Sequence, residues 1–342
     1  MGLESCEALR EATRGCLLVL LTATDAEAEP LLQAFQAPAT YVMATKKVVV
    51  GRIAAEQDPT KASVGGGGFR AALAVSGCDK ANTAHILACL LMAMDPPPLL
   101  VIQVGAAGAF LEPAEGADLT VSTGPPVGTG PPAGTGPPAG SGLGVPSRSG
   151  VGRLPGGGQR PAIGDLVFAT EEIYSDTGSS SPAGWISAGE LGLPIARVDG
   201  IESGERFPLD LGLVRAAVDV IDRIDGGDWP DGRPAVFTGP CVTSSRVTGI
   251  RSEGEWIARR WDAVAESMEG AAAAHVCGLH GLPFLEVRGI SNLVVDRDRA
   301  SWDVTRAVEV AGRAALAVAA ALDTLPLPKG LPSSGCPPPP GA

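Results

Sequence analysis

The fold is decided by residues 265–292, which read AESMEGAAAAHVCGLHGLPFLEVRGISN. In this stretch the alanine-rich segment 271–278 predicts a helix, and the apolar run 283–288 predicts a strand. Further strands are predicted at 17–21 and 99–104, and the nearly continuous apolar character of the second is typical of a strand buried on both faces of a sheet. Strands that alternate with helices predict a single-domain, three-layer α/β/α fold around a central mixed sheet.

The remaining predicted elements follow the same alternation. Additional strands are expected at 48–50, 72–75, 165–169 and 235–238, and additional helices at 29–35, 81–94, 211–224, 252–261 and 304–322. Pro30 suits the first turn of its helix if that helix begins near Glu29, because proline needs no hydrogen-bond partner for an N–H there.

A segment rich in glycine and proline interrupts this pattern. Between residues 124 and 161, 22 of 38 residues are glycine or proline, and TGPPVG, TGPPAG and TGPPAG follow one another from residue 123 to 140. Because so little of it can be buried, 124–161 is predicted to be a disordered insertion within one domain that spans 17–325. Residues 1–16 are predicted to be a disordered N-terminal extension, and 326–342 a proline-rich tail.

Composition limits the classes of function. The chain has 342 residues, of which 45% are hydrophobic and 19% charged, and its formal net charge is −12. An acidic chain without a basic run lacks the electrostatic footprint for nucleic acid or an anionic membrane, so neither partner is expected. Seven cysteines without a C-x-x-C pair are interpreted as reduced thiols, and three histidines make a metal site improbable. No signal peptide is recognised, and a cytoplasmic location is expected.

Polar side chains surround the predicted helix and strand of the opening stretch. Glu266 and Glu269 precede the helix, Arg288 ends the strand, and Asn292 lies in the loop beyond it. Ligands of open α/β sheets bind outside the carboxyl ends of strands, so this set predicts a site. Each residue alone has an ordinary explanation: a glutamate at a helix start, an arginine in an ion pair, an asparagine in a turn. His275, on the alanine-rich face, is interpreted as a core histidine.

The opening stretch resembles the corresponding segment of the methylthioadenosine/adenosylhomocysteine nucleosidases and their relatives. The resemblance extends to LLVLLTATDAEAEPLL (17–32), SGCDKANTAHIL (76–87), VIQVGAAGAF (101–110) and GDLVFATEEIYSDTG (164–178). It covers nearly the whole chain apart from the two ends and the insertion. Within that superfamily the futalosine hydrolase branch is the most similar, on the basis of ESMEG with its extra serine, RGISN, GCDKAN (77–82) and PAGWISAGELGLP (182–194).

The resemblance implies a nucleoside-phosphorylase-like fold and a particular reaction. Members of the futalosine hydrolase branch hydrolyse the N-ribosyl bond of futalosine and release hypoxanthine and dehypoxanthine futalosine in menaquinone biosynthesis. The resemblance therefore implies a small purine nucleoside as substrate, no cofactor and no metal. It also implies a homo-oligomer, a dimer or larger, in which a neighbour contributes to the pocket for the 5′ substituent.

The resemblance also implies roles for individual residues. Glu27 matches the acid that activates the water, and Arg288 matches an arginine near that water. Met268 and Glu269 match the residues that line the ribose, with Glu269 holding its hydroxyls. Such groups suit the chemistry, because an N-ribosyl bond breaks through an oxocarbenium-like sugar that carboxylates stabilise.

Two further positions matter for the sugar and the base. Gly105 and Ala106 match a loop that flanks the sugar, but Ala106 stands where relatives carry a serine. Asn292 matches the base-recognition position. An amide there can donate to O6 of hypoxanthine and accept from N7–H as the base leaves, which favours a 6-oxopurine over adenine. Because an amide cannot deliver a proton, N7 must be protonated from solvent.

Three other functions remain open at this point. A 6-oxopurine nucleoside phosphorylase would need an anion site, for which Arg246 and Arg251 are candidates. A methylthioadenosine/adenosylhomocysteine nucleosidase is disfavoured by Asn292. A non-catalytic nucleoside-binding protein is disfavoured by the presence of both Glu27 and Glu269. Trp185, in the branch-typical stretch, is a candidate for closing over the 5′ substituent.

Overall fold

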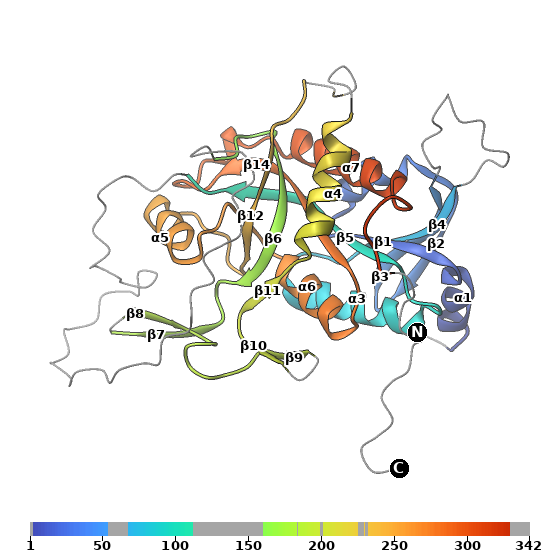
Figure 1. The fold of residues 1–342 in the computed structure, drawn as a ribbon, viewed down its shortest axis with the longest axis horizontal. Coiled ribbons are helices and arrows are strands. Elements are labelled where there is room, and N and C mark those ends of the chain that lie inside the picture. Colours follow the sequence, from blue (N-terminus) through green and yellow to red (C-terminus); the bar gives the residue numbers. More distant parts are fainter. Residues whose placement is uncertain are drawn as a thin grey trace, which may run out of the picture.

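The computed structural model describes residues 3–53, 68–111, 160–182, 184–198, 201–224, 229 and 232–328. The backbone of these residues forms one ten-stranded mixed sheet, two small hairpins and the helices that cover the sheet (Figure 1). Residues 112–159, which hold nearly all of the predicted Gly/Pro insertion, and 329–342 of the predicted tail lie outside the described residues.

The strands follow a mixed order in the main sheet. Their order is β11-β6-β12-β13-β5-β1-β4-β3-β2, and β14 pairs with both β5 and β6. Their bounds are β1 Cys16–Thr22, β2 Phe35–Met43, β3 Lys46–Ile53, β4 Phe69–Val75, β5 Leu100–Ala109, β6 Leu166–Tyr174, β11 Arg206–Pro208, β12 Val236–Thr243, β13 Ala265–Ser267 and β14 Phe284–Leu293. The small hairpins are β7 Gly178–Ser181 with β8 Gly184–Ser187, and β9 Ala196–Val198 with β10 Ile201–Ser203.

Five of these strands close into a ring. β6 pairs with β12, β12 with β13, β13 with β5, β5 with β14, and β14 returns to β6. The parallel neighbours of β5 are β1 and β14, so β5, which is buried along almost its whole length, lies at the centre of the sheet. Because β5 precedes residues 112–159 and its partners β13 and β14 follow them, the two halves of the chain share one sheet.

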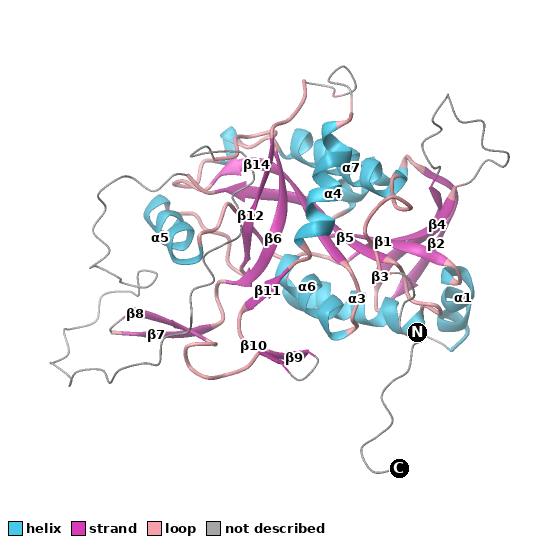
Figure 2. Cartoon of the chain, viewed as in Figure 1, coloured by secondary structure: helices cyan, strands magenta, loops and turns pink. Residues whose placement is uncertain are grey.

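Helices cover both faces of the sheet (Figures 1 and 2). In β1, Leu18 and Leu20 pack into a core with α2, α4 and α7, whereas Val19 and Leu21 pack into a second core with α1, α3 and α6. A strand buried on both faces needs a continuous apolar run, which explains the sequence LLVLL. The helix bounds are α1 Leu3–Thr13, α2 Asp25–Leu32, α3 Lys80–Ala93, α4 Leu211–Asp222, α5 Arg251–Trp261, α6 Gly270–Leu279 and α7 Val304–Ala320. The predicted three-layer α/β/α fold is confirmed.

The N-terminal end differs from its prediction. Residues 1–16 were expected to be disordered, but Leu3–Thr13 form α1 and Cys16 begins β1. Leu9 is buried in the second core while Arg10 and Glu11 stay exposed. The mixed charge of this segment thus belongs to the outer face of an amphipathic helix.

The region after β1 also differs. The helix expected to begin near Glu29 begins at Asp25, so Pro30 lies inside α2 and not in its first turn. The chain from Phe35 to Met43 forms β2, which was not predicted. Pro38 weakened its strand signal, yet β2 lies at the edge of the sheet and its pairing with β3 is irregular between Gln36 and Ala39, where a proline is tolerated.

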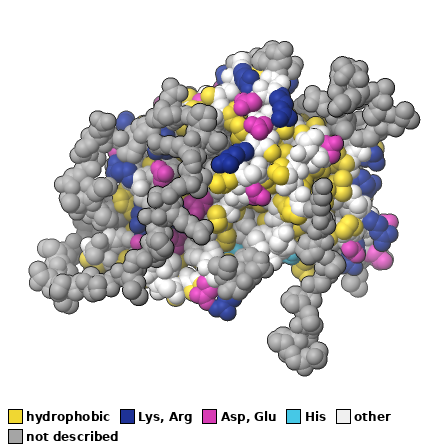
Figure 3. Space-filling model, in the orientation of Figure 1, with side chains coloured by type: hydrophobic (Ala, Val, Ile, Leu, Met, Phe, Trp, Pro, Cys, Tyr) yellow, Lys and Arg dark blue, Asp and Glu magenta, His cyan; other side chains and the backbone are white. Residues whose placement is uncertain are grey.

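The surface carries charges of both signs (Figure 3). On the face drawn in Figure 3, basic and acidic side chains are interspersed among apolar ones. Among the described residues, no helix has both the length and the apolar character that a bilayer span requires. In that same part of the chain, no group of three or more His, Cys, Asp or Glu side chains is arranged to hold a metal ion.

Candidate active site

Glu27 is fixed at the start of α2 by hydrogen bonds to the backbone. Its Oε2 accepts from the N–H groups of Ala23 and Thr24, both at 2.9 Å, and its own N–H donates to Thr24 Oγ1 at 3.2 Å. This reciprocal capping box sets the carboxylate in place before any ligand binds. Its Oε1 accepts from the N–H of Ala106 at 3.0 Å. Glu27 therefore lies in the first turn of α2 and not in the loop after the first strand.

Glu27 and Arg288 meet over Gly105. In the parallel pair β5–β14, Arg288 lies opposite Gly105. A Cβ atom on residue 105 would stand 2.7 Å from Arg288 Nη1 and 2.9 Å from Glu27 Cδ, so a side chain cannot occupy this position. The main chain of Ala106 joins the two groups, because its N–H donates to Glu27 and its carbonyl accepts from Arg288 Nη1 at 3.3 Å.

Gly105 and Ala106 lie inside β5, and the prediction that they form a loop is wrong. The strand continues because β14 pairs with it as far as Ala109. Since Ala106 contacts both charged groups through its backbone, these contacts do not depend on its side chain. The serine that relatives carry would add only a hydroxyl to them.

Glu269 directly precedes α6 and lies beside the same arginine. Its Oε2 lies 3.3 Å from Arg288 Nη2 and accepts from the N–H of Met268 at 3.3 Å, and its Oε1 accepts from the N–H of Asp79 at 3.2 Å. Burial raises the pKa of Glu269 above its ordinary value, and Arg288 opposes this. Met268 itself is half-buried.

Arg288 is the largest fully buried side chain of the described residues, with 1% of its surface exposed. Its Nε pairs with Glu286, its Nη1 with the carbonyl of Ala106 and its Nη2 with Glu269. Burial disfavours its charge, but the carboxylates of Glu286, Glu269 and Glu27 outweigh burial and raise its pKa. Arg288 therefore remains charged. It lies in the middle of β14 and not at its end, whereas Ser291 and Asn292 lie near the end of the same strand and not in a loop beyond it.

Two further carboxyl groups, those of Glu172 and Glu286, lie on the inner side of Arg288. Glu172 and Glu286 are both fully buried, and both approach Gly270 so closely that residue 270 has no room for a side chain. Glu172 Oε2 accepts from Thr243 Oγ1 at 3.0 Å. Burial and the neighbouring Glu286 raise the pKa of Glu172 well above its ordinary range. We therefore assign the neutral form to Glu172, whereas Glu286 forms the ion pair with Arg288.

Sequence reasoning missed Glu172 and Glu286. A carboxyl group within an apolar strand was the available signal, in FATEEIY and FLEVR. Each glutamate stands in a strand of the closed ring, β6 or β14, and only the pairing of these two strands brings them together.

Asn292 lies further along β14 than Arg288, opposite Gly108 of β5. Its Oδ1 accepts from Ser291 Oγ at 2.9 Å, and its Nδ2 donates to the carbonyl of Leu293 at 3.2 Å. The side chain is half-buried and its nitrogen would lie 3.1 Å from a Cβ on residue 108. The structure thus brings Glu27, Glu269 and Arg288 into one cluster and sets Asn292 beside it.

The remaining candidates lie in other surroundings. His275 Nδ1 lies 3.3 Å from the hydroxyl of Tyr174, and its ring stacks on Phe207 at 4.9 Å. Burial lowers its pKa, as expected for a packed, neutral histidine. The ring of Trp185 packs over Gly178 within the β7–β8 hairpin.

The two arginines of the phosphorylase alternative are already paired. Arg246 forms an ion pair with the buried Glu253, and Arg251 pairs with Glu255 at 3.0 Å. A phosphate would have to compete with these carboxylates for either guanidinium.

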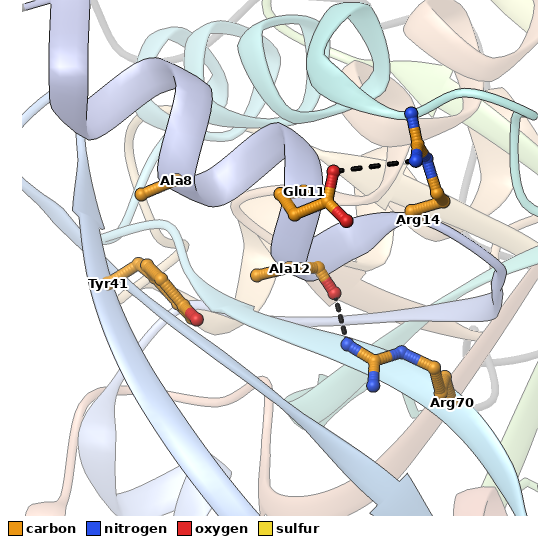
Figure 4. A pocket seen from close by; sticks show the side chains of 6 residues that line it. All are labelled: Ala8, Glu11, Ala12, Arg14, Tyr41 and Arg70. Carbon is orange, nitrogen blue, oxygen red and sulfur yellow. Dashed lines mark hydrogen bonds and ion pairs between the residues drawn. The ribbon is translucent and has the colours of Figure 1, made fainter.

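A hollow on another part of the surface lacks the chemistry of the site (Figure 4). It has a volume of about 530 Å³ and lies between α1, β2 and β4. Its charged groups are occupied: Glu11 pairs with Arg14 at 3.5 Å, and Arg70 donates to the carbonyl of Ala12. The cluster around Arg288 is therefore the better candidate for an active site.

Comparison with known proteins agrees with the fold and with the resemblance. Residues 156–325 match the family model of the phosphorylase superfamily. Curated futalosine hydrolases of Streptomyces coelicolor and Thermus thermophilus are each 31% identical to this chain, over 43% and 45% of it. The matches cover 53% and 60% of those relatives, so the chain spans little more than half the length of the proteins it matches.

Solved structures of nucleosidases share the fold. The methylthioadenosine/adenosylhomocysteine nucleosidase of Neisseria meningitidis, bound to methylthio-immucillin-A, aligns with a TM-score of 0.59 at 18% identity, over 90% of this chain and 99% of that one. The enzyme of Colwellia psychrerythraea, bound to adenine, gives 0.60 at 17% identity, over 94% and 98%. The fold is thus nucleoside-phosphorylase-like, and in sequence the chain resembles the phosphorylase superfamily and the curated futalosine hydrolases.

Proposed function

We propose that this protein hydrolyses the N-ribosyl bond of futalosine, releasing hypoxanthine and dehypoxanthine futalosine, in menaquinone biosynthesis. The observation that carries the proposal is the meeting of Glu27 and Arg288 over Gly105, with Glu269 on the same guanidinium. The similarity to curated futalosine hydrolases supports this choice of nucleoside.

The charge of the cluster suits an oxocarbenium-like sugar. One guanidinium stands among the carboxylates of Glu27, Glu269 and Glu286, so the surroundings of Arg288 are net negative. A fixed negative environment favours the positive charge that develops as the bond between the sugar C1′ and the base N9 breaks. Glu269 is proposed to hold the ribose hydroxyls together with Met268, and Arg288 orients Glu269 through the contact at 3.3 Å.

Glu27 is proposed to activate the water. Its Oε2 is occupied by the capping box, whereas Oε1 accepts a single hydrogen bond and retains a lone pair toward Gly105. A water that donates to Oε1 can attack C1′ as its proton passes to Glu27. The bonding electrons of C1′–N9 pass to the base, and the base gains its proton from solvent.

Asn292 is proposed to bind the O6 and N7 edge of the purine. Its amide can donate to O6 and accept from N7–H, whereas the 6-amino group of adenine would face the amide donor. We also infer that the protein acts in the cytoplasm as a homo-oligomer, and that Trp185 closes over the 5′ substituent.

The test is the release of free base from futalosine, inosine and methylthioadenosine, with and without phosphate. We expect hypoxanthine from futalosine without phosphate. Glu27→Gln should lower kcat by about 10²–10⁴-fold. Glu29→Gln, an exposed residue of the same helix, serves as the matched control and should leave kcat unchanged.

Each contrary result points to a different function. Base release that requires phosphate would identify a phosphorylase, and release of adenine alone would identify a methylthioadenosine nucleosidase. Binding of nucleosides without any release, or full activity of Glu27→Gln, would contradict catalysis by this cluster.

A further inference from the structure

Thr243 ties the start of α6 to a buried carboxyl group. The N–H of Ala271, in the first turn of α6, donates to Thr243 Oγ1 at 2.8 Å, and this hydroxyl group donates to Glu172 Oε2 at 3.0 Å. Thr243 lies in β12 and Glu172 in β6, and both residues are fully buried. Because a hydroxyl group has one proton, Thr243 accepts from the helix and donates to Glu172, which fixes the direction of both hydrogen bonds.

Glu172 meets Glu286 beside Gly270. A Cβ atom on residue 270 would stand 2.4 Å from Glu172 Oε2 and 2.2 Å from Glu286 Oε2, so these two oxygens are near neighbours. Two fully buried carboxyl groups that lie so close cannot both be ionised without a large electrostatic cost, so one of them keeps a proton. Since Glu286 forms the ion pair with Arg288, the proton belongs on Glu172.

A proton on Glu172 also supplies a hydrogen bond where one is needed. Glu172 Oε1 and Glu286 Oε2 are both buried, and neither has a hydrogen-bond partner among the described residues. Buried polar atoms of folded proteins are nearly always hydrogen-bonded, so such a pair of atoms needs an explanation. An O–H group of Glu172 that donates to Glu286 Oε2 uses lone pairs that the ion pair with Arg288 leaves free.

These contacts close a loop that returns to the ribose cluster. Glu286 Oε1 accepts from Arg288 Nε, and Arg288 Nη2 lies 3.3 Å from Glu269 Oε2. Glu269 directly precedes α6, and Ala271 of that helix begins the same chain of hydrogen bonds. A guanidinium is planar, so its contact through Nε fixes the directions in which both Nη atoms point. A shift of Glu286 would therefore move the contact between Arg288 and Glu269.

We propose that Glu172 is a positioning residue for cleavage of the ribosyl bond, which acts through Glu286 to hold the Arg288 guanidinium in the orientation that meets Glu269. This inference rests on the proposed function, because Glu269 is there assigned to the ribose hydroxyls. It extends the machinery from the cluster into the core behind it, since Glu172 acts on the sugar only through other side chains.

The first measurement is the steady-state release of base from futalosine by variants at position 172. Glu172→Met removes both the acceptor for Thr243 and the donor for Glu286, and should lower kcat by about 10- to 100-fold while KM stays within a few fold of the wild type. Glu172→Gln keeps an acceptor and a donor in a side chain of nearly the same shape, and should restore kcat to within a few fold.

Gln103→Met is the matched control. Gln103 is fully buried and lies opposite Glu286 in the pair β5–β14, but its side chain has no hydrogen-bond partner among the described residues. This variant should keep the wild-type kcat. Thermal melting verifies that each variant is folded, and if Glu172→Met does not fold, Thr243→Val takes its place, because it removes both hydrogen bonds of the hydroxyl group without changing the volume much.

A second measurement does not depend on the nucleoside. The Nε–H of Arg288 can be followed by NMR of protein labelled in its arginines and assigned by its loss in Arg288→Lys. It should exchange slowly with solvent, because it is buried and bound to Glu286. In Glu172→Met we expect exchange at least about tenfold faster, since a buried hydrogen bond to a charged group is weakened. Glu172→Gln and Gln103→Met should exchange as the wild type does.

The outcomes separate this inference from the proposed function. Wild-type kcat and wild-type exchange in Glu172→Met overturn it, and so does a loss in Glu172→Gln or Gln103→Met as large as that in Glu172→Met, which would indicate general damage to the core. In a protein that cleaves futalosine, a change in only one of the two measurements also overturns it, because Glu172 would then not act on the reaction through Arg288. Faster exchange in Glu172→Met of a protein that does not cleave futalosine contradicts only the proposed reaction.

Discussion

Polar residues of neighbouring strands form one row across the sheet at Gly105 and another at Gly108, and the two rows differ in how completely their polar groups are paired. At Gly105, the backbone of Ala106 contacts both Glu27 and Arg288, and each nitrogen of the Arg288 guanidinium has a protein partner. At Gly108, Glu266 Oε2 has no partner among the described residues, and Asn292 bonds only to its own neighbours in the chain.

This difference separates two tasks. A group that stabilises a developing charge should be held rigidly before the substrate binds, because reorganisation during the reaction costs energy. A group that reads the identity of a base must keep its hydrogen-bonding capacity for the ligand. The row at Gly105, in which the polar groups are paired with one another, is called the closed row and suits breaking the ribosyl bond. The row at Gly108, which keeps unused hydrogen-bonding groups, is called the open row and suits recognition of the base.

The largest expected effect follows from filling the closed row. In Gly105→Ala the new methyl group would stand 2.7 Å from Arg288 Nη1 and 2.9 Å from Glu27 Cδ, so both charged groups must move. We expect kcat to fall by at least about 10²-fold, as a displacement of about 1 Å can cause. Steady-state release of hypoxanthine measures this.

A matched pair of glycine variants sharpens the result. Gly108→Ala should raise KM more than it lowers kcat, because the new methyl group would stand 3.1 Å from Asn292 Nδ2 of the open row. Gly249→Ala has no neighbour closer than 3.7 Å and should behave as the wild type. Equal losses of kcat in the 105 and 108 variants would show that the two rows are not functionally distinct.

The second prediction concerns the support of Arg288. Glu286→Gln removes a carboxylate from a buried guanidinium and should lower the free energy of unfolding by roughly 3 kcal/mol. Glu172→Gln replaces a neutral carboxyl group with an amide of similar shape and should cost less than about 1 kcal/mol. Urea denaturation of both variants measures the difference. The reverse order would contradict the neutral form of Glu172.

How far the sequence predicts this site can be judged from the same residues. Apolar runs such as LLVLL and the alanine-rich helix start predict β1 and α6, because burial on both sides leaves a strong local pattern. Glu27, Glu269, Arg288 and Asn292 were selected from the sequence, and the structure brings the first three together. Their exact environment depends on strand pairing, which the local sequence does not reveal.

The features that sequence reasoning missed share this cause. Glu172 and Glu286 are far apart in the chain and meet only because β6 and β14 pair. The row through Gly108 depends on an irregularity in β14 between Ile290 and Asn292, which shifts Asn292 into register with that glycine. β2 was missed because its proline is compatible with an edge strand only, and the edge position is a property of the whole sheet.

The third prediction tests base choice in the open row. Asn292→Asp should lower kcat/KM for futalosine by roughly 10- to 100-fold, because an aspartic acid that gives its one proton to N7 has no donor left for O6. The new carboxyl group faces Glu266 across Gly108, and this like charge should raise the pKa of the pair so that a proton is retained. A protonated Asp can donate to N7, so cleavage of methylthioadenosine should appear. Unchanged kinetics on both substrates would contradict base recognition at 292.

The smallest effect is expected from the pH dependence of stability. Burial raises the pKa of Glu266 from an ordinary 4.5 to about 7; the Thr248 side chain, the Thr248 N–H and Arg246 oppose this shift, and Glu253 adds to it. A carboxyl group whose pKa is higher in the folded state binds more protons there, so its contribution to stability is lost as the pH rises toward and through 7.

Between pH 6 and pH 7.5 the wild-type protein should lose about 1 kcal/mol of its free energy of unfolding relative to Glu266→Gln. Urea denaturation of both proteins across this range measures the difference, and the neighbouring Asn292 does not titrate.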